Sequence, residues 1–537
     1  MNRNVIAALT ALLAAATAAA QSQRAPSGGS PQVRTANGLL AGTTESTDVR
    51  VFRGVPFAAP PVRELRWAPP QPARGWKGIR AADRFAAQCI QARLFGDMVF
   101  RNDAVSEDCL YLNVWAPAAP AHEPLPVLVY FYGGGFQAGD GSEPRYDGAS
   151  MARQGMVVVT TSYRLGIFGF FSHPELTSES PHHASGNYAL MDQAAALRWV
   201  RANVAAFGGD PSRVTIAGES AGSFSVSALM ASPLSRDLLA GAIGESGAFF
   251  SKTISTPPLA DSERRGVEFA TGVGARSVGA LRSMSAMEVL AAASRPGTPQ
   301  FGPNVDGWFF PDKPAALYAA GRQAHVPLLA GWNTEEMGAR AILRDDPTPE
   351  SMSKLLTTTF GDQAADAAQV YPSRTNDEAL RSATGLAGDQ FIAYSTWKWL
   401  EEHARTSGKP VYRYLFSRPR PPVTPLGEAI LGKSRPATGA SHSAEIEYVM
   451  GNLKGNRYFA WTDEDYRVSG TAQRYFANFV KTGNPNGNGL PVWPIGSHDA
   501  TGQAMRMRID VESRAEPEER ARYLFLDRFY AGQRPQD

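Results

Sequence analysis

One pentapeptide carries a residue type that can do covalent chemistry. It is Gly218-Glu219-Ser220-Ala221-Gly222, and it lies between an apolar run at 214–217, typical of a strand, and a segment at 224–230 that can be helical. A serine on a sharp turn from strand to helix has an exposed hydroxyl, and small neighbours let the two backbones pass closely. The helix N-terminus favours negative charge beside the serine. A bare Gly-x-Ser-x-Gly also occurs by chance, so the flanks carry the prediction that Ser220 is a nucleophile.

A serine hydroxyl needs a base to take its proton and an acid to orient that base. With an elbow of this kind the acid and then the histidine follow the serine along the chain. The run 326–330 is typical of a buried strand, and Glu335 and Glu336 come shortly after it. Either glutamate could orient a histidine, and either could instead stabilise a helix N-terminus by its charge. The residues alone leave both open.

Three histidines follow these glutamates. His403 lies in a charged stretch typical of a solvated helix face, and His498 lies in a polar loop near the C-terminus. We expect both at the surface. His442 lies in a loop of small residues, 439–444, from which an imidazole can reach into a cleft. The local pattern therefore favours His442 as the base.

The negative oxygen of an acyl-transfer intermediate needs N–H donors. Gly133-Gly134-Gly135 follows the apolar run 126–132, and a glycine backbone can approach a ligand closely. The N–H of Ala221, directly after the serine, would be a further donor. Glycine triplets also occur in ordinary loops, so this prediction depends on the elbow.

The elements that must position these residues alternate along the chain. A helical spacing of apolar residues spans 192–207, and short apolar or β-rich runs lie at 51–56, 110–115, 126–132, 156–162, 214–217, 242–244, 326–330 and 411–416. This alternation predicts an α/β fold with a mostly parallel sheet and helices on both faces. Segments 259–295 and 349–405 are predicted to be helical insertions that would wall a pocket over the carboxyl ends of the strands. Segment 417–440 has no clear periodicity.

Composition excludes some classes of partner. The chain has 537 residues, 43% of them hydrophobic, which is ample for a large core. Its formal net charge is +2 with both signs mixed throughout, which indicates neither nucleic acid nor an anionic membrane as a partner.

The N-terminus is typical of an export signal. Arg3 precedes an apolar stretch at 5–19, and Ala18-Ala19-Ala20 has the small-x-small pattern of a cleavage site. The stretch is too short to span a bilayer comfortably. We therefore predict a signal peptide at 1–20, a disordered mature start at 21–30, and a periplasmic or secreted protein with no membrane anchor after cleavage.

The chain has two cysteines, Cys89 and Cys109. In an exported protein an even pair predicts a disulfide, the alternative being two buried free thiols. No further cysteine or histidine lies near enough in sequence to complete a metal site. Neither a metal nor an organic cofactor is expected for serine chemistry.

Together these segments resemble the type B carboxylesterase family, which includes the cholinesterases and bacterial para-nitrobenzyl esterases. The resemblance covers nearly the whole chain after the signal. Its motifs include Phe52-Arg53-Gly54-Val55-Pro56, Glu107-Asp108-Cys109-Leu110, Tyr163-Arg164-Leu165-Gly166, Phe207-Gly208-Gly209-Asp210-Pro211 and Asn484-Pro485-Asn486. It implies one catalytic domain over 31–537 with the α/β-hydrolase fold, in which a large twisted sheet is flanked by helices and helical insertions form a gorge over the site.

The resemblance also assigns roles. It implies Glu336 as the acid, because the family motif places the acid three residues after an asparagine that corresponds to Asn333. It implies His442 as the base, because a Glu-Ile pair begins three residues after it. It implies that Ser246 supports the acid by hydrogen bonding and that Glu219 acts electrostatically or from behind the reacting groups. The remaining implied residues are the oxyanion donors Gly134, Gly135 and Ala221, and the disulfide of Cys89 with Cys109. Cholinesterases carry a tryptophan in the disulfide loop, whereas here only Phe95 and Phe100 are aromatic, so no cation–π site for choline is predicted.

The implied activity is hydrolysis of carboxylic esters through an acyl-serine intermediate. The expected partner is a small-molecule ester. The protein itself is expected to be a monomer or a dimer. Three alternatives stay open: a narrow-specificity exported esterase for phenolic, polyester-fragment or polyketide-type esters, an amidase or acyl transferase, and a non-catalytic binding module of the same fold.

Overall fold

A computed structural model of the chain describes residues 29–250, 254–432, 438–496 and 503–533. The predicted signal peptide at 1–20 lies outside the described residues, as do His498 and all but the last two residues of segment 21–30. Within the described ranges, no helix is both long enough and apolar enough to cross a membrane.

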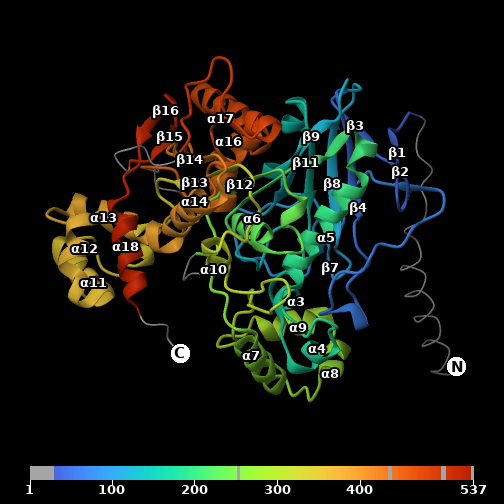
Figure 1. The fold of residues 1–537 in the computed structure, drawn as a ribbon, viewed down its shortest axis with the longest axis horizontal. Coiled ribbons are helices and arrows are strands. Elements are labelled where there is room, and N and C mark those ends of the chain that lie inside the picture. The colour runs from blue at the N-terminus through green and yellow to red at the C-terminus, as the bar shows by residue number, and fades with distance from the viewer. Residues whose placement is uncertain (1–28, 251–253, 433–437, 497–502, 534–537) are drawn as a thin grey trace.

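An eleven-stranded sheet runs through the molecule (Figure 1). In spatial order its strands are β16 (Arg514–Pro517), β15 (Met505–Ile509), β14 (Val411–Phe416), β13 (Leu328–Asn333), β12 (Gly241–Glu245), β11 (Gly209–Glu219), β9 (Leu125–Phe131), β10 (Val157–Thr161), β8 (Tyr111–Pro117), β4 (Val49–Pro56) and β3 (Thr43–Glu45). Neighbours from β15 to β10 are parallel, and the pairs at both ends are antiparallel. The mostly parallel sheet expected from the sequence is confirmed.

Helices cover both faces of this sheet. Residues three apart on a strand point to opposite faces. A side chain at Gly244 of β12 would collide with Trp399 of α14 (Tyr394–Ser407), whereas one at Gly241 would approach Phe479 of α17 (Asp463–Thr482). α6 (Ala221–Ala231) packs on β11 and β12 beside α5 (Tyr188–Asn203). The central strands are thus covered on both faces, which suits their continuous apolar sequences.

Two groups of helices lie beside the sheet in Figure 1. One consists of α7 (Leu259–Gly272), α8 (Val278–Ser283) and α9 (Ala286–Ala293), and the other of α11 (Pro349–Phe360), α12 (Ala364–Val370), α13 (Asn376–Gly388) and α18 (Ala521–Gly532). Segment 417–440, which has no clear periodicity, contains a short helix, α15 (Pro425–Leu431). Thr424 caps it and Pro425 occupies its first turn, so local capping makes this helix where periodicity is absent.

Short elements complete the chain. They are β1 (Gln32–Thr35), β2 (Gly38–Ala41), β5 (Ile79–Ala81), β6 (Gln88–Cys89), β7 (Val105–Ser106), α2 (Ala149–Arg153), α3 (Gly166–Phe170), α4 (Pro174–Glu179), α10 (Pro314–Ala319) and α16 (Ile446–Met450).

The expectation that His403 lies on a solvated helix face is wrong. Its side chain is fully buried, because α14 packs this face against β13. Its Nε2 lies 2.9 Å from the carbonyl oxygen of Val326. Burial lowers the pKa of His403 to about 4, so the imidazole is neutral at ordinary pH and donates this hydrogen bond. Of the charged neighbours that suggested a surface residue, Arg405 is exposed, whereas Glu401 and Glu402 are half-buried in ion pairs with Arg413 and Arg405.

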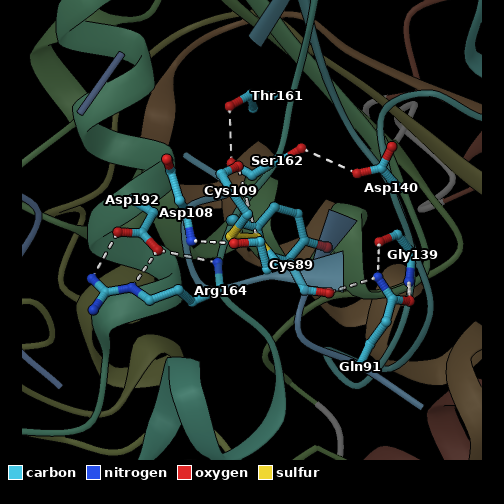
Figure 2. Close-up of a disulfide and its surroundings, with 12 residues drawn as sticks. Cys89, Gln91, Asp108, Cys109, Gly139, Asp140, Thr161, Ser162, Arg164 and Asp192 are labelled. Atoms are coloured by element: carbon cyan, nitrogen blue, oxygen red, sulfur yellow. Dashed lines mark hydrogen bonds and ion pairs between the residues drawn. A yellow bond between two sulfur atoms is a disulfide. The ribbon is translucent and has the colours of Figure 1, made fainter. Parts of the chain in front are cut away.

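Cys89 and Cys109 form a disulfide, as predicted. Figure 2 shows Gln91, just after Cys89, reaching to Gly139. The Gln91 Nε2 donates to the Gly139 carbonyl at 2.9 Å, and the Gly139 N–H donates to the Gln91 Oε1 at 2.8 Å. The disulfide loop is therefore tied to the segment that follows β9. Figure 2 also shows the buried pair of Arg164 and Asp192, whose closest atoms are 2.8 Å apart.

Replacing both Cys89 and Cys109 with alanine is expected to lower the free energy of unfolding. The disulfide closes a loop across 20 residues, and removing that constraint from the unfolded chain should cost about 3 kcal/mol. Denaturant unfolding of the variant beside the oxidised wild type measures the difference, and wild type reduced with dithiothreitol is the matched control. Equal unfolding midpoints for all three proteins would contradict the expectation.

Candidate active site

The turn after β11 holds Ser220 in a strained conformation. Its φ is 55° and its ψ is −121°, a region that side chains rarely adopt. The Ser220 N–H donates to the carbonyl of Glu245 at 2.8 Å, which fixes the turn to β12. A side chain at Gly222 would collide with the carbonyl oxygen of Phe131, and a Cβ at Gly218 would lie 2.6 Å from the carbonyl carbon of Gly222. Both glycines are therefore required by the close approach of β11, β9 and α6.

The segments that carry the acid and the histidine are fastened together. Asn333 ends β13, and its side-chain amide donates to the carbonyl of Ser441 at 2.8 Å. The Glu335 N–H donates to the carbonyl of Ala440 at 2.8 Å. Residues that are about a hundred positions apart in sequence are thus held in register by backbone and amide hydrogen bonds.

The structure brings three predicted side chains into one hydrogen-bonded chain. His442 Nε2 lies 2.9 Å from the Oγ of Ser220, and His442 Nδ1 lies 2.6 Å from the Oε2 of Glu336. The neighbouring carboxylate of Glu335 points elsewhere and accepts a hydrogen bond from Thr438. Of the two glutamates that the residues alone left open, Glu336 is the one in contact with His442.

The other oxygen of Glu336 is held from behind. Its Oε1 accepts hydrogen bonds from the Ser246 hydroxyl at 2.5 Å and from the Asn333 N–H at 2.6 Å. Ser246 directly follows β12 and, like Ser220, has a positive φ, here 58°. With one oxygen on the imidazole and the other on two donors, the Glu336 carboxylate has little freedom to rotate.

Two further buried glutamates lie behind this chain, and the sequence reasoning gave neither a role. Glu445 accepts a hydrogen bond from the Asn333 amide at 2.6 Å, and Glu245 lies at the end of β12. Burial raises the pKa of Glu445 to about 8, with Glu219 and Glu336 acting in the same direction. Burial, together with the charges of Glu445 and Glu219, also raises the pKa of Glu245. Both shifts favour the protonated carboxyl, and the sequence signal that could have found these residues is a glutamate within an otherwise apolar strand or helix start.

Glu219 sets the electrostatics of the histidine. Its Oε1 lies 3.2 Å from His442 Nε2, and its side chain is 3% exposed, against 26% for His442. Burial raises the pKa of Glu219 to about 7, and the positive charges of His442 and Arg145 oppose that rise. Burial lowers the pKa of His442, but the carboxylates of Glu219 and Glu336 outweigh it and raise this pKa to about 9.

The glycine triplet supplies unused donors. Gly134 and Gly135 have φ of 106° and 63°, conformations that favour glycine, and a side chain at Gly134 would collide with the carbonyl of Ala138. Among the described residues, no acceptor takes a hydrogen bond from the N–H of Gly134, Gly135 or Ala221. These three donors are thus available to a bound oxygen.

The whole arrangement lies where four parallel strands end. Ser220 follows β11, Ser246 follows β12, Glu336 follows β13, and the glycine triplet follows β9. Such a set can pass a proton from a hydroxyl to an imidazole while donors face a developing negative charge.

Comparison with known proteins identifies the family. The sequence model of the Carboxylesterase family matches residues 29–524. The chain belongs to this family. The resemblance to type B carboxylesterases is thereby confirmed, and the protein is a carboxylic ester hydrolase.

Relatives of this carboxylesterase span most of its length. It is 38% identical to fumonisin B1 esterase from Sphingopyxis macrogoltabida over 421 residues, which cover 76% of this chain and 72% of that one. It is 34% identical to para-nitrobenzyl esterase from Bacillus subtilis over 507 residues, covering 91% of this chain and 97% of that one. A solved structure of PNB esterase superimposes with a TM-score of 0.75 at 32% identity, covering 92% of this chain and 99% of the other. The α/β-hydrolase fold is therefore confirmed.

Replacing Glu219 with glutamine should lower the pKa of His442. The Glu219 carboxylate favours the charged imidazolium, so its removal leaves a group that loses its proton at lower pH. NMR titration of the imidazole, assigned by loss of its signal in His442→Gln, measures the shift. Replacing the half-buried Glu335 with glutamine is the control, and an unchanged or raised pKa of His442 in Glu219→Gln would contradict this electrostatic account.

Proposed function

We propose that this enzyme hydrolyses carboxylic esters with Ser220 as nucleophile, His442 as general base and acid, and Glu336 as the group that orients the histidine. The observation that carries this proposal is the unbroken chain from Ser220 Oγ through the imidazole to the Glu336 carboxylate, at 2.9 and 2.6 Å. These distances lie within the range in which a proton can transfer.

In the proposed reaction the neutral form of His442, which its raised pKa makes the minor form at pH 7, accepts the Ser220 proton as the hydroxyl attacks the ester carbonyl. Glu336 keeps the proton of the neutral imidazole on Nδ1 and stabilises the imidazolium that forms. His442 then gives the proton to the departing alcohol, and an acyl-serine remains. Water attacks this ester by the same route and releases the acid. Apart from the ester and water, every proton transfer in this scheme involves Ser220 or His442.

The negative oxygen that forms during attack would be bound by Gly134, Gly135 and Ala221. Their free N–H groups support this assignment, as does the helix that begins at Ala221. Each such donor contributes about 3 kcal/mol to the stability of the transition state in comparable sites. Glu219 would hold negative charge next to the imidazolium, and Ser246 would keep the Glu336 carboxylate in place.

The cellular location is part of the proposal. We infer that residues 1–20 direct export and that cleavage after Ala20 releases a periplasmic or secreted enzyme whose single catalytic domain is 31–537. Edman sequencing of the protein purified from its host tests this inference, since a mature chain that starts at Gln21 is expected.

Turnover of a p-nitrophenyl ester panel, acetate through decanoate, tests the activity. Ser220→Ala should lower kcat by at least about a thousandfold while circular dichroism stays unchanged. Ser220-dependent turnover of short esters would support a general carboxylesterase. A folded wild type that is no faster than Ser220→Ala on any ester would contradict the proposal and favour a narrow-specificity hydrolase or a binding module.

Glu336→Gln should lower kcat by about a thousandfold or more, because a neutral amide can stabilise neither the Nδ1–H tautomer nor the imidazolium. Glu335→Gln is the matched control: it alters the adjacent glutamate, which does not contact His442, and should leave kcat within about twofold. Equal losses in the two variants would argue against Glu336 as the orienting acid.

Ser246→Ala should have a smaller effect. It removes one of the two donors to Glu336 Oε1 and leaves the Asn333 N–H in place. A decrease of about tenfold in kcat, with KM nearly unchanged, is expected for the loss of one hydrogen bond to a charged group. Steady-state kinetics on p-nitrophenyl acetate measure it, and full activity would show that the serine does not position the acid.

A further inference from the structure

A cavity of about 140 Å³ opens beside Gly135. The loop after β9 forms one wall of it, α7 forms another, and residues 300–303 form a third. A Cβ built on Gly135 would have no atom within 4 Å, so open space borders this glycine directly. The cavity therefore begins at one of the proposed oxyanion donors.

The position of the cavity indicates which part of a substrate it holds. In the proposed reaction the carbonyl oxygen lies at the glycine donors, and the departing alcohol must lie within reach of His442. His442 does not line the cavity, nor does Phe391, whose ring centroid is 5.0 Å from that of His442. A cavity that borders Gly135 and not His442 is placed to receive the acyl group. This step rests on the proposed function.

The cavity wall carries one charge. Arg265 of α7 is the only charged residue among the described residues that line it. The side chain of Arg265 is exposed, and it makes no ion pair with any described acid. Its neighbours on the helix are engaged differently: Arg264 pairs with Asp261 at 2.7 Å, and Glu263 accepts a hydrogen bond from Thr177 at 2.5 Å.

The other lining groups suit a short chain with a polar end. Phe136, Phe170 and Phe301 offer ring surface to methylene groups, and the Phe136 and Phe170 centroids are 5.2 Å apart. Ser255, Ser262 and Gln300 add hydrogen-bond donors to the lining, and Ser262 lies on α7 three residues before Arg265. A lining that combines apolar ring surface with a guanidinium and hydroxyls matches an acyl chain that ends in an anion.

We propose that this esterase hydrolyses half-esters of dicarboxylic acids, and that Arg265 binds the free carboxylate of the acyl group. Arg265 is here a specificity-determining residue: it would favour acyl groups that carry a carboxylate over neutral ones of the same shape. The guanidinium can bind both oxygens of a carboxylate at once, and the wall contains no acid that would compete for it among the residues described.

Matched ester pairs test the proposal. The ethyl half-esters of succinic, glutaric and adipic acids are compared with the ethyl esters of the corresponding monoamides, which have the same shape and no charge. We expect kcat/KM for at least one half-ester to exceed that of its amide partner. Arg265→Ala should lower kcat/KM for that half-ester about tenfold and leave the amide within about twofold, as expected for a charged hydrogen bond.

Further variants separate charge from packing. Arg265→Lys should keep part of the preference and Arg265→Glu should reverse it. Arg264→Ala removes the neighbouring, paired arginine and should leave kcat/KM unchanged for both the half-ester and its amide partner. The preference should also weaken as NaCl rises from 50 to 500 mM, because salt screens the contact.

Two results would overturn the proposal while leaving the proposed activity intact. One is Ser220-dependent turnover that favours the neutral amide at all three chain lengths, and the other is an equal loss on both esters in Arg265→Ala. A folded enzyme with no Ser220-dependent turnover of either ester would overturn the proposed activity and this inference together.

Discussion

The close approach of three backbones at the turn after β11 is the constraint on which the site depends. Gly218 and Gly222 let β11 and α6 pass within contact of the carbonyl of Phe131 at the end of β9. The same approach forces Ser220 into its positive φ and leaves the first N–H groups of α6 beside the glycine triplet. The proposed nucleophile and the candidate oxyanion donors are thus placed by one packing requirement. The hydrogen bond from the Ser220 N–H to the Glu245 carbonyl of β12 stabilises the strained turn.

A second constraint is the number of buried carboxyl groups around one imidazole. Glu219, Glu245, Glu336 and Glu445 all lie within the protein at the ends of β11, β12 and β13 and at the start of α16. They cannot all be charged in so small a volume. Hydrogen bonds from Ser246 and Asn333 hold one oxygen of Glu336 in place, whereas burial and neighbouring carboxyl groups raise the pKa of Glu245 and of Glu445. The two glutamates that contact His442, Glu219 and Glu336, are the ones that raise its pKa most.

The disulfide loop and the helical insertions act on the site from outside the sheet. Gln91 ties the loop of Cys89 and Cys109 to Gly139, close behind the glycine triplet. α7 approaches from another side and brings Arg265 to the cavity next to Gly135. The strand ends therefore position the proposed reacting groups, and α7 lines the cavity in which we propose that the acyl group is selected.

The sequence by itself determined the α/β class, the central strands and the turn at Ser220, because buried parallel strands are apolar throughout and a tight elbow demands small residues at fixed positions. It could not choose between Glu335 and Glu336 without a family resemblance, since both follow the same strand and only the pairing of Glu335 with Ala440 decides which one turns toward His442. It misjudged His403, which lies on a helix that packs on β13 and whose charged neighbours Glu401 and Glu402 are themselves half-buried in ion pairs. The tertiary structure alone decided these points, together with the raised pKa of Glu445 and the place of Arg265, because burial and long-range contacts depend on segments far away in the chain.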